Sequence, residues 1–328
     1  MWKHVEFRYL DHEQVHACRP SACELMDLIE VCYQDRASGG AQVPPKTRIA
    51  PRKGVFVHAK PGYLPSMDVA GIKWQSNVPE NPDRGLPNNI GLVVLTDPET
   101  GVPRAVMDCT WITALRTPAA SMVAIKRLAR SGARQVGIVG LGLQGRCHFD
   151  ALIESAVLPN LETVRFYDLN PVATAAFEAH ASGKANLEIR PCSTPKDALK
   201  DADVMISCTL FQRPDPTVVP DWIKPGALCL PVDLGAYWSA ESRASVDLIA
   251  TDDEPQTQSF AHADFFPEDK LRIDVEMAEI VSGKHPGREN DDQRIMCINA
   301  GLSTYDIAMA ERVLEKAARE GVGTVLQW

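Results

Sequence analysis

The chain has 328 residues, of which 45% are hydrophobic, and a formal net charge of −9 at pH 7. This length and hydrophobic content suffice for a large buried core divided between two domains. The acidic balance, without any basic cluster, argues against nucleic acid as a partner. No apolar run reaches the ~20 residues that span a bilayer, and the polar first residues do not resemble a signal peptide. We therefore expect a cytoplasmic protein with no membrane partner.

The cysteines and histidines form no recognisable metal or redox motif. Nine cysteines are present without a CxxC pair, so we expect buried free thiols. No group of residues has metal-ligand spacing, and no metal is expected. His148, His262 and His285 are candidate acids or bases by residue type alone, and we expect His148 to be a packing or surface position on a helix.

The first third of the chain predicts a strand-rich α/β domain. A short strand comes first, and Ser21 with Glu24 then forms a capping box at the start of a helix. Residues 37–51 are rich in turn-forming residues and contain Pro44 and Pro45. Strands are predicted over residues 55–58, 69–74, 91–96 and 105–109.

Three cations and one amide in this region are candidates for substrate binding. Arg48 is predicted in the proline-rich loop, and Lys73 at the end of a strand. Asn88 is predicted in a loop and Arg116 just before a helix. Two arginines and a lysine that converge on one cleft would bind an α-carboxylate, because guanidinium offers a planar bidentate fork. Taken singly, an exposed arginine is usually only a solvated charge, but Lys73 lies in otherwise buried strand sequence and must be paired or functional.

A helix over about residues 115–129 is predicted to lead into a second pattern. From residue 134, short apolar strands alternate with helices, which predicts a doubly wound parallel sheet. A long helix rich in Ala, Glu and Lys is expected over residues 302–319. The strands of the second pattern are predicted at residues 136–139, 164–167, 187–190, 204–208, 227–232 and 247–250.

The first of these strands ends in a GxGxxG turn, which is followed by a helix, a second strand and Asp168. This order is typical of a dinucleotide-binding βαβ unit. Gly140 permits the tight turn, Gly142 lets the backbone approach a pyrophosphate, and Gly145 packs the helix on the strand. Asp168 can accept hydrogen bonds from the ribose hydroxyls of NAD and would repel the extra phosphate of NADP. We therefore expect NAD, with NADP as the less favoured cofactor.

Several motifs resemble those of the ornithine cyclodeaminase/mu-crystallin family, and they occur in the family's order. The resemblance covers about residues 20–325 and implies a Rossmann domain joined to a substrate domain that forms a homodimer through its sheet. We expect a substrate-binding and dimerisation domain over residues 1–116, an NAD-binding Rossmann domain over 117–300, and a C-terminal helix over 301–328 that returns to the substrate domain. The motifs are GIKW at 71–74, Asn81, GLP at 85–87, TALRT at 113–117, the glycine turn with Gln144, and residues 280–288 and 301–308.

The resemblance also implies roles for individual residues. Arg48 and Arg116 would hold the substrate carboxylate, and Lys73 would lie beside the reacting carbon or its carboxylate. Asn88 stands where some members of the family have a threonine near the substrate. The implied cofactor-binding residues are Thr117, Gly140, Gly142, Leu143, Gln144 and Asp168, with Thr209 and Asn299 along the nicotinamide half.

The sequence departs from the family pattern in the loop at residues 231–238. Cyclodeaminases carry an aspartate there, and counting back from Glu241 places that position on Gly235. Asp233, two residues away, would replace it only if the loop is shifted, and otherwise would cap the loop or orient the nicotinamide amide. We expect the aromatic pair Tyr237 and Trp238 to help shape the pocket.

The sequence thus predicts an NAD-dependent oxidoreductase that moves a hydride between nicotinamide and the α carbon of an amino acid or its imine. Lys73 and Asp233 are the expected catalytic groups. Imine reduction and amino-acid oxidation are one reaction in two directions, and both remain open. One alternative is an ornithine cyclodeaminase-type ammonia lyase that recycles its NAD. A second is a dinucleotide-binding protein of the mu-crystallin kind with little turnover.

Overall fold

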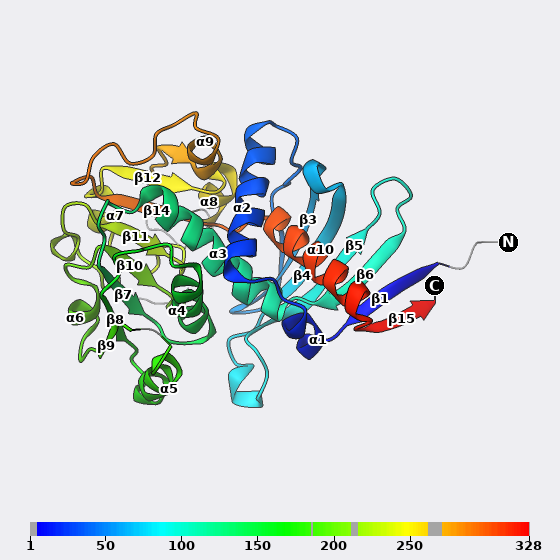
Figure 1. Ribbon diagram of the computed structural model, residues 1–328, viewed down its shortest axis with the longest axis horizontal. Coiled ribbons are helices and arrows are strands. Elements are labelled where there is room, and N and C mark those ends of the chain that lie inside the picture. Colours follow the sequence, from blue (N-terminus) through cyan, green and yellow to red (C-terminus); the bar gives the residue numbers. More distant parts are fainter. Residues whose placement is uncertain (1–4, 185, 211–215, 262–270, 328) are drawn as a thin grey trace. The chain divides into compact units, whose positions relative to one another are not determined.

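The computed structural model describes residues 5–184, 186–210, 216–261 and 271–327. The chain divides into two compact units, and each contains its own sheet (Figure 1). The first unit comprises Met1–Arg116 and Leu302–Trp328 and is called the substrate unit below, after the role expected for it from the sequence. The second comprises Thr117–Gly301 and is called the nucleotide unit, again after its expected role. His262 lies outside the described residues.

The substrate unit is built on a seven-stranded sheet with the order β15-β1-β6-β5-β4-β3-β2. Its pairs are antiparallel except β1 with β6. The long helix α10 lies across β3, β4 and β5 and also packs against α2 (Figure 1). The strands are β1 (Glu6–Leu10), β2 (Thr47–Arg52), β3 (Val55–Leu64), β4 (Val69–Asn77), β5 (Asn89–Thr96), β6 (Pro103–Asp108) and β15 (Thr324–Gln327), and the helices are α1 (His12–Ala17), α2 (Ala22–Ala37) and α10 (Ser303–Glu320), with short 3-10 turns at Pro65–Met67 and Pro82–Arg84.

Helix α2 begins where its capping residues predict. The Ser21 side chain accepts a hydrogen bond from the Glu24 backbone, and the Glu24 carboxylate accepts one from the Ser21 backbone in return. Leu25, Leu28 and Ile29 are buried along one face of the helix. The capping box at Ser21 and the apolar stripe therefore act together to set where the helix starts and which side it buries.

Two predictions about this unit were wrong. Arg48 lies on the edge strand β2 and not in a loop, because Thr47, Arg48 and Ile49 pair with β3. The register shifts after Ile49, so Pro51 falls in an irregular stretch of an edge strand, where its missing N–H is tolerated. Lys73 lies in the middle of β4 rather than at the end of a strand, since the pairing continues to Asn77.

Helix α3 (Thr110–Leu128) begins earlier than the sequence suggests, so Arg116 lies within it rather than before it. The Asp108 carboxylate accepts hydrogen bonds from the Thr110 backbone N–H at 2.8 Å and from its hydroxyl at 3.1 Å, which caps the helix at that point. Pro118 lies inside the helix and removes only its own N–H donor. Thr113 and Arg116, three residues apart, consequently share one helix face.

The nucleotide unit contains an eight-stranded sheet with the order β13-β12-β14-β11-β10-β7-β8-β9, and all of its pairs are parallel. The predicted doubly wound sheet is thereby confirmed. The strand order reverses between β7 and β10, which is where ligands bind in such sheets. The strands are β7 (Gln135–Val139), β8 (Thr163–Tyr167), β9 (Glu188–Pro191), β10 (Val204–Ser207), β11 (Leu228–Pro231), β12 (Leu248–Thr251), β13 (Val275–Glu276) and β14 (Ile295–Ile298), and the remaining helices are α4 (Leu143–Ser155), α5 (Pro171–Ala181), α6 (Pro195–Leu199), α7 (Ala240–Ala244), α8 (Glu254–Ala261) and α9 (Met277–Val281), with a 3-10 turn at Pro220–Trp222.

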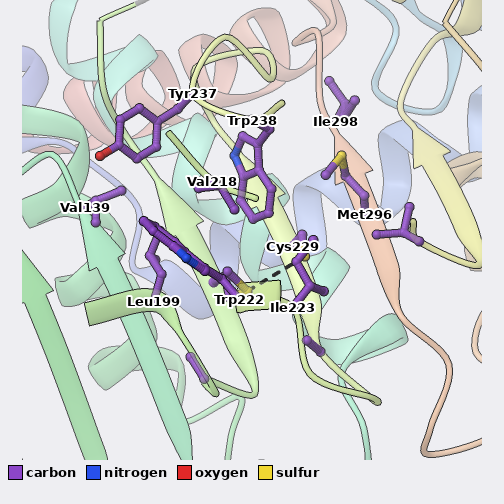
Figure 2. Packing of buried hydrophobic residues seen from close by; sticks show 14 of the residues in the cluster. Val139, Leu199, Val218, Trp222, Ile223, Cys229, Tyr237, Trp238, Met296 and Ile298 are labelled. Atoms are coloured by element: carbon purple, nitrogen blue, oxygen red, sulfur yellow. Dashed lines mark hydrogen bonds between the residues drawn. The ribbon is translucent and has the colours of Figure 1, made fainter. Parts of the chain in front are cut away.

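The core of the nucleotide unit extends to the loop that follows β11. Figure 2 shows Trp238 beside Val218, and the backbones of these two residues form a bridge. The Trp238 indole is fully buried and donates to the Ser207 hydroxyl at 2.8 Å. Trp238 therefore anchors the loop in the core, so of the aromatic pair expected to shape a pocket only Tyr237 does so, in the cleft beside the glycine turn.

Candidate active site

The glycine turn between β7 and α4 contains two close approaches of the backbone and one open position. Gly140 has a φ of +83°, and a Cβ on it would lie 2.5 Å from the Cys208 carbonyl oxygen. A Cβ on Gly145 would lie 2.1 Å from the Gly140 carbonyl oxygen, so the first turn of the helix packs directly on the loop. A Cβ on Gly142, the N-cap of α4, would meet no atom of the described chain within 4 Å. The turn thus leaves open space at Gly142, where a phosphate could approach the backbone.

A cleft of about 690 Å³ lies at this point of the sheet. Four predicted cofactor-binding residues line it: Gly140, Gly142, Asp168 and Thr209. Its walls also contain apolar side chains that could cover a base, and among the described residues that line it none is a lysine or arginine. The cleft is large enough for part of a dinucleotide, and its described lining offers no positive charge that would favour a 2′-phosphate.

The Asp168 carboxylate connects the glycine turn to the end of β8. One oxygen accepts the Leu141 N–H at 2.7 Å, and the other accepts the Asn170 N–H at 2.8 Å. Each carboxylate oxygen retains a second acceptor site, so both could also accept a ribose hydroxyl. Asp168 is therefore held in place by the backbone before any ligand is bound.

Asp233 is almost completely buried beside Thr209. One carboxylate oxygen accepts the Thr209 hydroxyl at 2.9 Å, and the other accepts the Gly235 N–H at 3.2 Å. Leu234 and Gly235 both have positive φ, so the chain turns sharply immediately after Asp233. Burial raises the pKa of Asp233 to about 6, although hydrogen bonds from Ser207 and Thr209 oppose the rise. The carboxyl group can therefore change its protonation state near neutral pH.

The other predicted cofactor residues occupy three elements of the nucleotide unit. Leu143 and Gln144 begin α4, and Thr117 is a half-buried residue of α3. Asn299 follows β14, and its side-chain oxygen accepts the Cys297 thiol at 3.5 Å. The described lining of the cleft contains none of these four residues.

Two of the three candidate histidines have structural contacts. His148 is fully buried, with one ring nitrogen 3.0 Å from the Ser121 hydroxyl and the other 2.8 Å from the Gln144 carbonyl. Burial lowers the pKa of His148 to about 4, so the ring is neutral at pH 7. His285 accepts the Gly287 N–H at 3.0 Å within a turn. His148 thus has the surroundings of a packing residue.

In the substrate unit, Lys73 and Arg116 meet at one carboxylate. The Lys73 ammonium donates to Asp306 Oδ1 at 2.5 Å, and Arg116 Nε donates to the same oxygen at 3.0 Å. Lys73 also donates to the Thr113 hydroxyl at 3.2 Å, and Lys73, Arg116 and Asp306 are all buried. Lys73 and Arg116 are therefore brought together, and Asp306 orients both.

The charges of this cluster shift one another's protonation. Burial alone would raise the pKa of Asp306, but Lys73, Arg116 and Lys60 bring it down to about 2. Burial lowers the pKa of Lys73, and the nearby Arg116 adds to this effect, while Asp306 opposes it. Asp306 is thus firmly ionised, and Lys73 gives up its proton more readily than an exposed lysine does.

Arg48 and Asn88 lie in different surroundings from this cluster. The exposed Arg48 guanidinium is centred 5.0 Å from the Phe56 ring, which gives a cation–π contact. The Asn88 side chain accepts from the Asn89 amide at 3.4 Å, and its backbone carbonyl accepts the Val78 N–H. Among the described contacts, neither residue bonds directly to Lys73 or Arg116.

Two central residues of the cluster, Asp306 and Lys60, had no predicted role. Asp306 occurs within an otherwise apolar stretch of the final helix, which is a signal for a buried acid that needs cations. Lys60 lies directly opposite Lys73 in the β3–β4 pairing and is only 6% exposed. Only this cross-strand register marks Lys60 as part of the cluster, and the sequence alone does not show which strands pair.

Neither a membrane-spanning helix nor a metal-binding group occurs among the described residues. No helix there is both long and apolar enough to cross a membrane. No group of three or more His, Cys, Asp or Glu residues in the same part of the chain could hold a metal ion.

The sequence and the fold were compared with known proteins. A model of the ornithine cyclodeaminase/mu-crystallin family matches residues 9–321. A nodulation efficiency protein of Rhizobium meliloti is 33% identical over 98% of this chain and 98% of its own.

Two solved structures are similar over almost the whole chain. Thermococcus litoralis Δ1-pyrroline-2-carboxylate reductase, in complex with NADH and L-proline, has a TM-score of 0.86 at 30% identity and covers 97% of this chain and 99% of its own. An archaeal alanine dehydrogenase dimer with bound NAD has a TM-score of 0.87 at 29% identity and covers 98% and 99% of the two chains. The family expected from the motifs is confirmed, and this chain belongs to the ornithine cyclodeaminase/mu-crystallin family.

Proposed function

We propose that this protein is an NAD-dependent oxidoreductase that transfers a hydride between nicotinamide and the α carbon of an amino acid or its imine. The observation that carries the proposal is the buried cluster of Lys73, Arg116 and Asp306, whose cations suit a substrate carboxylate. The two similar structures support it, because their names describe a reductase of a cyclic imino acid and an amino-acid dehydrogenase.

The proposed cofactor site is the cleft at the glycine turn. The open space at Gly142 and the fixed carboxylate of Asp168 fit a pyrophosphate and a ribose diol. Bound NAD would supply or accept the hydride. We assign its binding to Thr117, Gly140, Gly142, Leu143, Gln144, Asp168, Thr209 and Asn299.

The proposed substrate site uses the cations of the substrate unit. Asp306 binds Arg116 only through Nε among the described contacts, so the two terminal guanidinium nitrogens could take a carboxylate as a bidentate pair. Lys73 is fixed by Asp306 and Thr113 beside Arg116 and adds a second positive charge. Arg48 would close over the same carboxylate from the edge strand, and Asn88 would contact the remainder of the substrate. Holding the carboxylate in this way orients the α carbon for hydride transfer.

The proposed reaction also moves a proton at the substrate nitrogen. Asp233 is our candidate for this role, because a pKa of about 6 allows both protonation states at neutral pH. In the absence of substrate, its hydrogen bonds to Thr209 and Gly235 hold the carboxyl group in one orientation. Lys73, whose pKa is lowered by burial, is the second candidate.

We further propose that the protein is a homodimer formed through the exposed face of the substrate-unit sheet. Cross-strand neighbours Trp74 and Leu92 lie there, and Ile49 and Ile90 project from the same face. These side chains are 38–52% exposed, which is unusual for large apolar groups that lie together. Light scattering on the purified protein tests this proposal, and a Trp74→Arg/Leu92→Arg variant should be monomeric. A wild-type monomer, or a dimeric variant, would contradict it.

The reaction is tested by absorbance at 340 nm. NADH or NADPH is supplied with 2-oxo acids plus ammonia or methylamine, or with cyclic imino acids. L-Amino acids with NAD test the reverse direction. Loss of NADH with one class of imine, with slower use of NADPH, is the expected result. An unchanged absorbance at 340 nm in every mixture would refute the oxidoreductase proposal.

The same experiment separates the two alternatives. A cyclodeaminase would release ammonia from ornithine or lysine in the presence of NAD without accumulating NADH. Gly235 at the position of the family aspartate weighs against that activity, because Asp233 is held by Thr209 and Gly235. A binding protein with little turnover would bind NADH in a fluorescence titration and remain inactive in every mixture.

A further inference from the structure

Lys60 is a second buried lysine directly beside the substrate cluster. It lies opposite Lys73 in the antiparallel β3–β4 register, and the two residues are 6% and 0% exposed. Like charges directly opposite each other in a sheet are destabilising, and a buried charge is costly unless it is paired. The position of Lys60 therefore calls for a negatively charged partner.

The described chain does not provide that partner. The Lys60 ammonium has three N–H donors, and its one hydrogen bond to a described residue is to the neutral Gln75 side-chain oxygen at 3.1 Å. Within the residues that the structure describes, no carboxylate forms an ion pair with Lys60. Asp306, the acid of this cluster, already accepts from both Lys73 and Arg116.

The Gln75 side chain is held with its oxygen, a hydrogen-bond acceptor, toward Lys60. Its amide nitrogen donates to Asn89 Oδ1 at 3.3 Å, and that oxygen also accepts from Asn77 at 3.0 Å. Rotating the Gln75 amide would break the bond to Asn89 and turn N–H groups toward an ammonium. The amide ladder on β4 and β5 thus fixes one acceptor at Lys60 and leaves its other donors for a ligand.

An anionic substrate can compensate an excess of positive charge in the buried cluster. When Lys60 and Lys73 are both protonated, these two lysines and Arg116 carry three positive charges, and Asp306, which pairs with Lys73 and Arg116, carries one negative charge, so two positive charges are in excess. The α-carboxylate assigned to Arg116 and Lys73 compensates one of them. We propose that Lys60 binds a second anionic group on the substrate, so that the preferred substrate is an α-imino or α-amino acid with an acidic side chain. This inference rests on the oxidoreductase function proposed above.

Binding of an anion at Lys60 would also change the protonation of this lysine. Burial, together with the positive charge of Lys73, lowers the pKa of Lys60 well below its usual value. Burial and the charge of Lys60 also lower the pKa of His58 to about 3, so the histidine adds no positive charge at pH 7. A bound anion would restore the Lys60 ammonium to a stable charged state.

The test compares substrates of equal length that differ in one charge. NADH oxidation is measured with ammonia and either 2-oxoglutarate or 2-oxopentanoate, and again with oxaloacetate or 2-oxobutanoate. The acidic member of a pair should have a kcat/KM roughly 10- to 100-fold higher, as expected for one buried charge-assisted contact. Lys60→Met should remove most of this preference. Lys53→Met, which deletes an exposed lysine of the same hairpin, is the control and should keep it.

Two results would overturn the assignment of Lys60. One is a wild-type kcat/KM that is equal for the neutral and the acidic member of a pair. The other is a Lys60→Met variant that retains the preference for the acidic member. A protein that reduces none of the four acids but does reduce a cyclic imino acid or a methylamine-derived imine would also contradict the acidic-substrate assignment, whereas inactivity in every mixture of the 340 nm assay would contradict the proposed function. Lys60 would then be judged by thermal shift with glutarate and pentanoate. Greater stabilisation by glutarate in the wild type, lost in Lys60→Met, would support a dianion site, and equal stabilisation would refute it.

Discussion

Replacing Asp306 with asparagine removes the carboxylate that Lys73 and Arg116 share while keeping the shape of the side chain. Asp306 Oδ1 accepts from the Lys73 ammonium at 2.5 Å and from Arg116 Nε at 3.0 Å, and all three residues are buried. The variant leaves two buried cations without their counter-charge. Breaking a buried ion pair by removing one partner typically destabilises a protein by about 3–5 kcal/mol.

The pKa of Asp306 gives a second value for the stability that the variant loses. It falls from 3.8 to about 2 in the folded protein, which corresponds to roughly 2 kcal/mol of stabilisation by the ionised form. The value from the pKa is lower than the roughly 3–5 kcal/mol for loss of an ion-pair partner, because it includes the cost of burying the charged carboxylate, which opposes the stabilisation by the cations. We therefore expect Asp306→Asn to lower the free energy of unfolding by about 2–5 kcal/mol at pH 7.

The pH dependence follows from the direction of the shift. The folded pKa of Asp306 is depressed, so its stabilising effect is complete above pH about 4 and is lost as the pH falls toward 2. The difference in unfolding free energy between wild type and variant should be constant from pH 5 to pH 7. It should shrink below pH 4, where the wild-type carboxylate is itself being neutralised.

Urea denaturation followed by tryptophan fluorescence measures this difference at each pH. Glu315→Gln is the matched control, because Glu315 lies on the same helix and pairs with Arg312, and the two side chains are 37% and 47% exposed. That pair faces solvent, so its loss should cost no more than about 1 kcal/mol. An Asp306→Asn variant within 1 kcal/mol of wild type, or no less stable than Glu315→Gln, would refute the reasoning.

Further predictions concern the substrate and cofactor residues. Arg116→Ala should abolish turnover, with a smaller change in the NADH dissociation constant; near-normal kcat/KM would contradict the carboxylate assignment. Asp168→Ser should weaken NADH binding about 10-fold and reduce discrimination against NADPH in fluorescence titrations, because one charged contact to the ribose is lost; an unchanged preference would count against the assignment. A Cβ on Gly145 would collide with the loop, whereas one on Gly142 would meet open space. Gly145→Ala should therefore lower the melting temperature, whereas Gly142→Ala should keep it and lose NADH affinity; equal melting temperatures would refute this contrast. The raised pKa of Asp233, from 3.8 to about 6, stabilises the fold below pH 4, an effect lost as the pH rises through 6. Asp233→Asn should gain up to about 3 kcal/mol relative to wild type between pH 4 and pH 7 in urea denaturation, and a pH-independent difference would contradict the shift.

The nucleotide unit was predictable because its signals are local. The apolar strand before Gly140, the glycine spacing and Asp168 follow one another within a short stretch of chain. Each of these features acts on its immediate neighbours, as the bond from the Leu141 N–H to Asp168 illustrates. The alternation of strands and helices then favours only a parallel sheet, since parallel strands need a crossover connection.

The substrate cluster was only half predictable because its contacts span the chain. Lys73 and Arg116 stood out by residue type, but Asp306 lies more than 180 positions away from either of them. The proximity of Lys60 to this cluster follows only from the β3–β4 register, which places Lys60 opposite Lys73. The start of α3 was misplaced for a related reason, because the Asp108 cap lies at the end of a strand and the helix was predicted to begin at about residue 115.

The same excess of positive charge that is costly to the empty protein can account for its choice of substrate. Lys60 and Lys73 face each other in a buried position, so the free protein carries an electrostatic penalty that an uncharged ligand would leave in place. An anion bound there gains its own hydrogen bonds and also relieves that penalty. At a concentration 100 times its dissociation constant, such a ligand adds about 2.7 kcal/mol to the stability of the fold. Since a neutral side chain of the same length would fill the space without compensating Lys60, discrimination between the two would arise from charge rather than from shape.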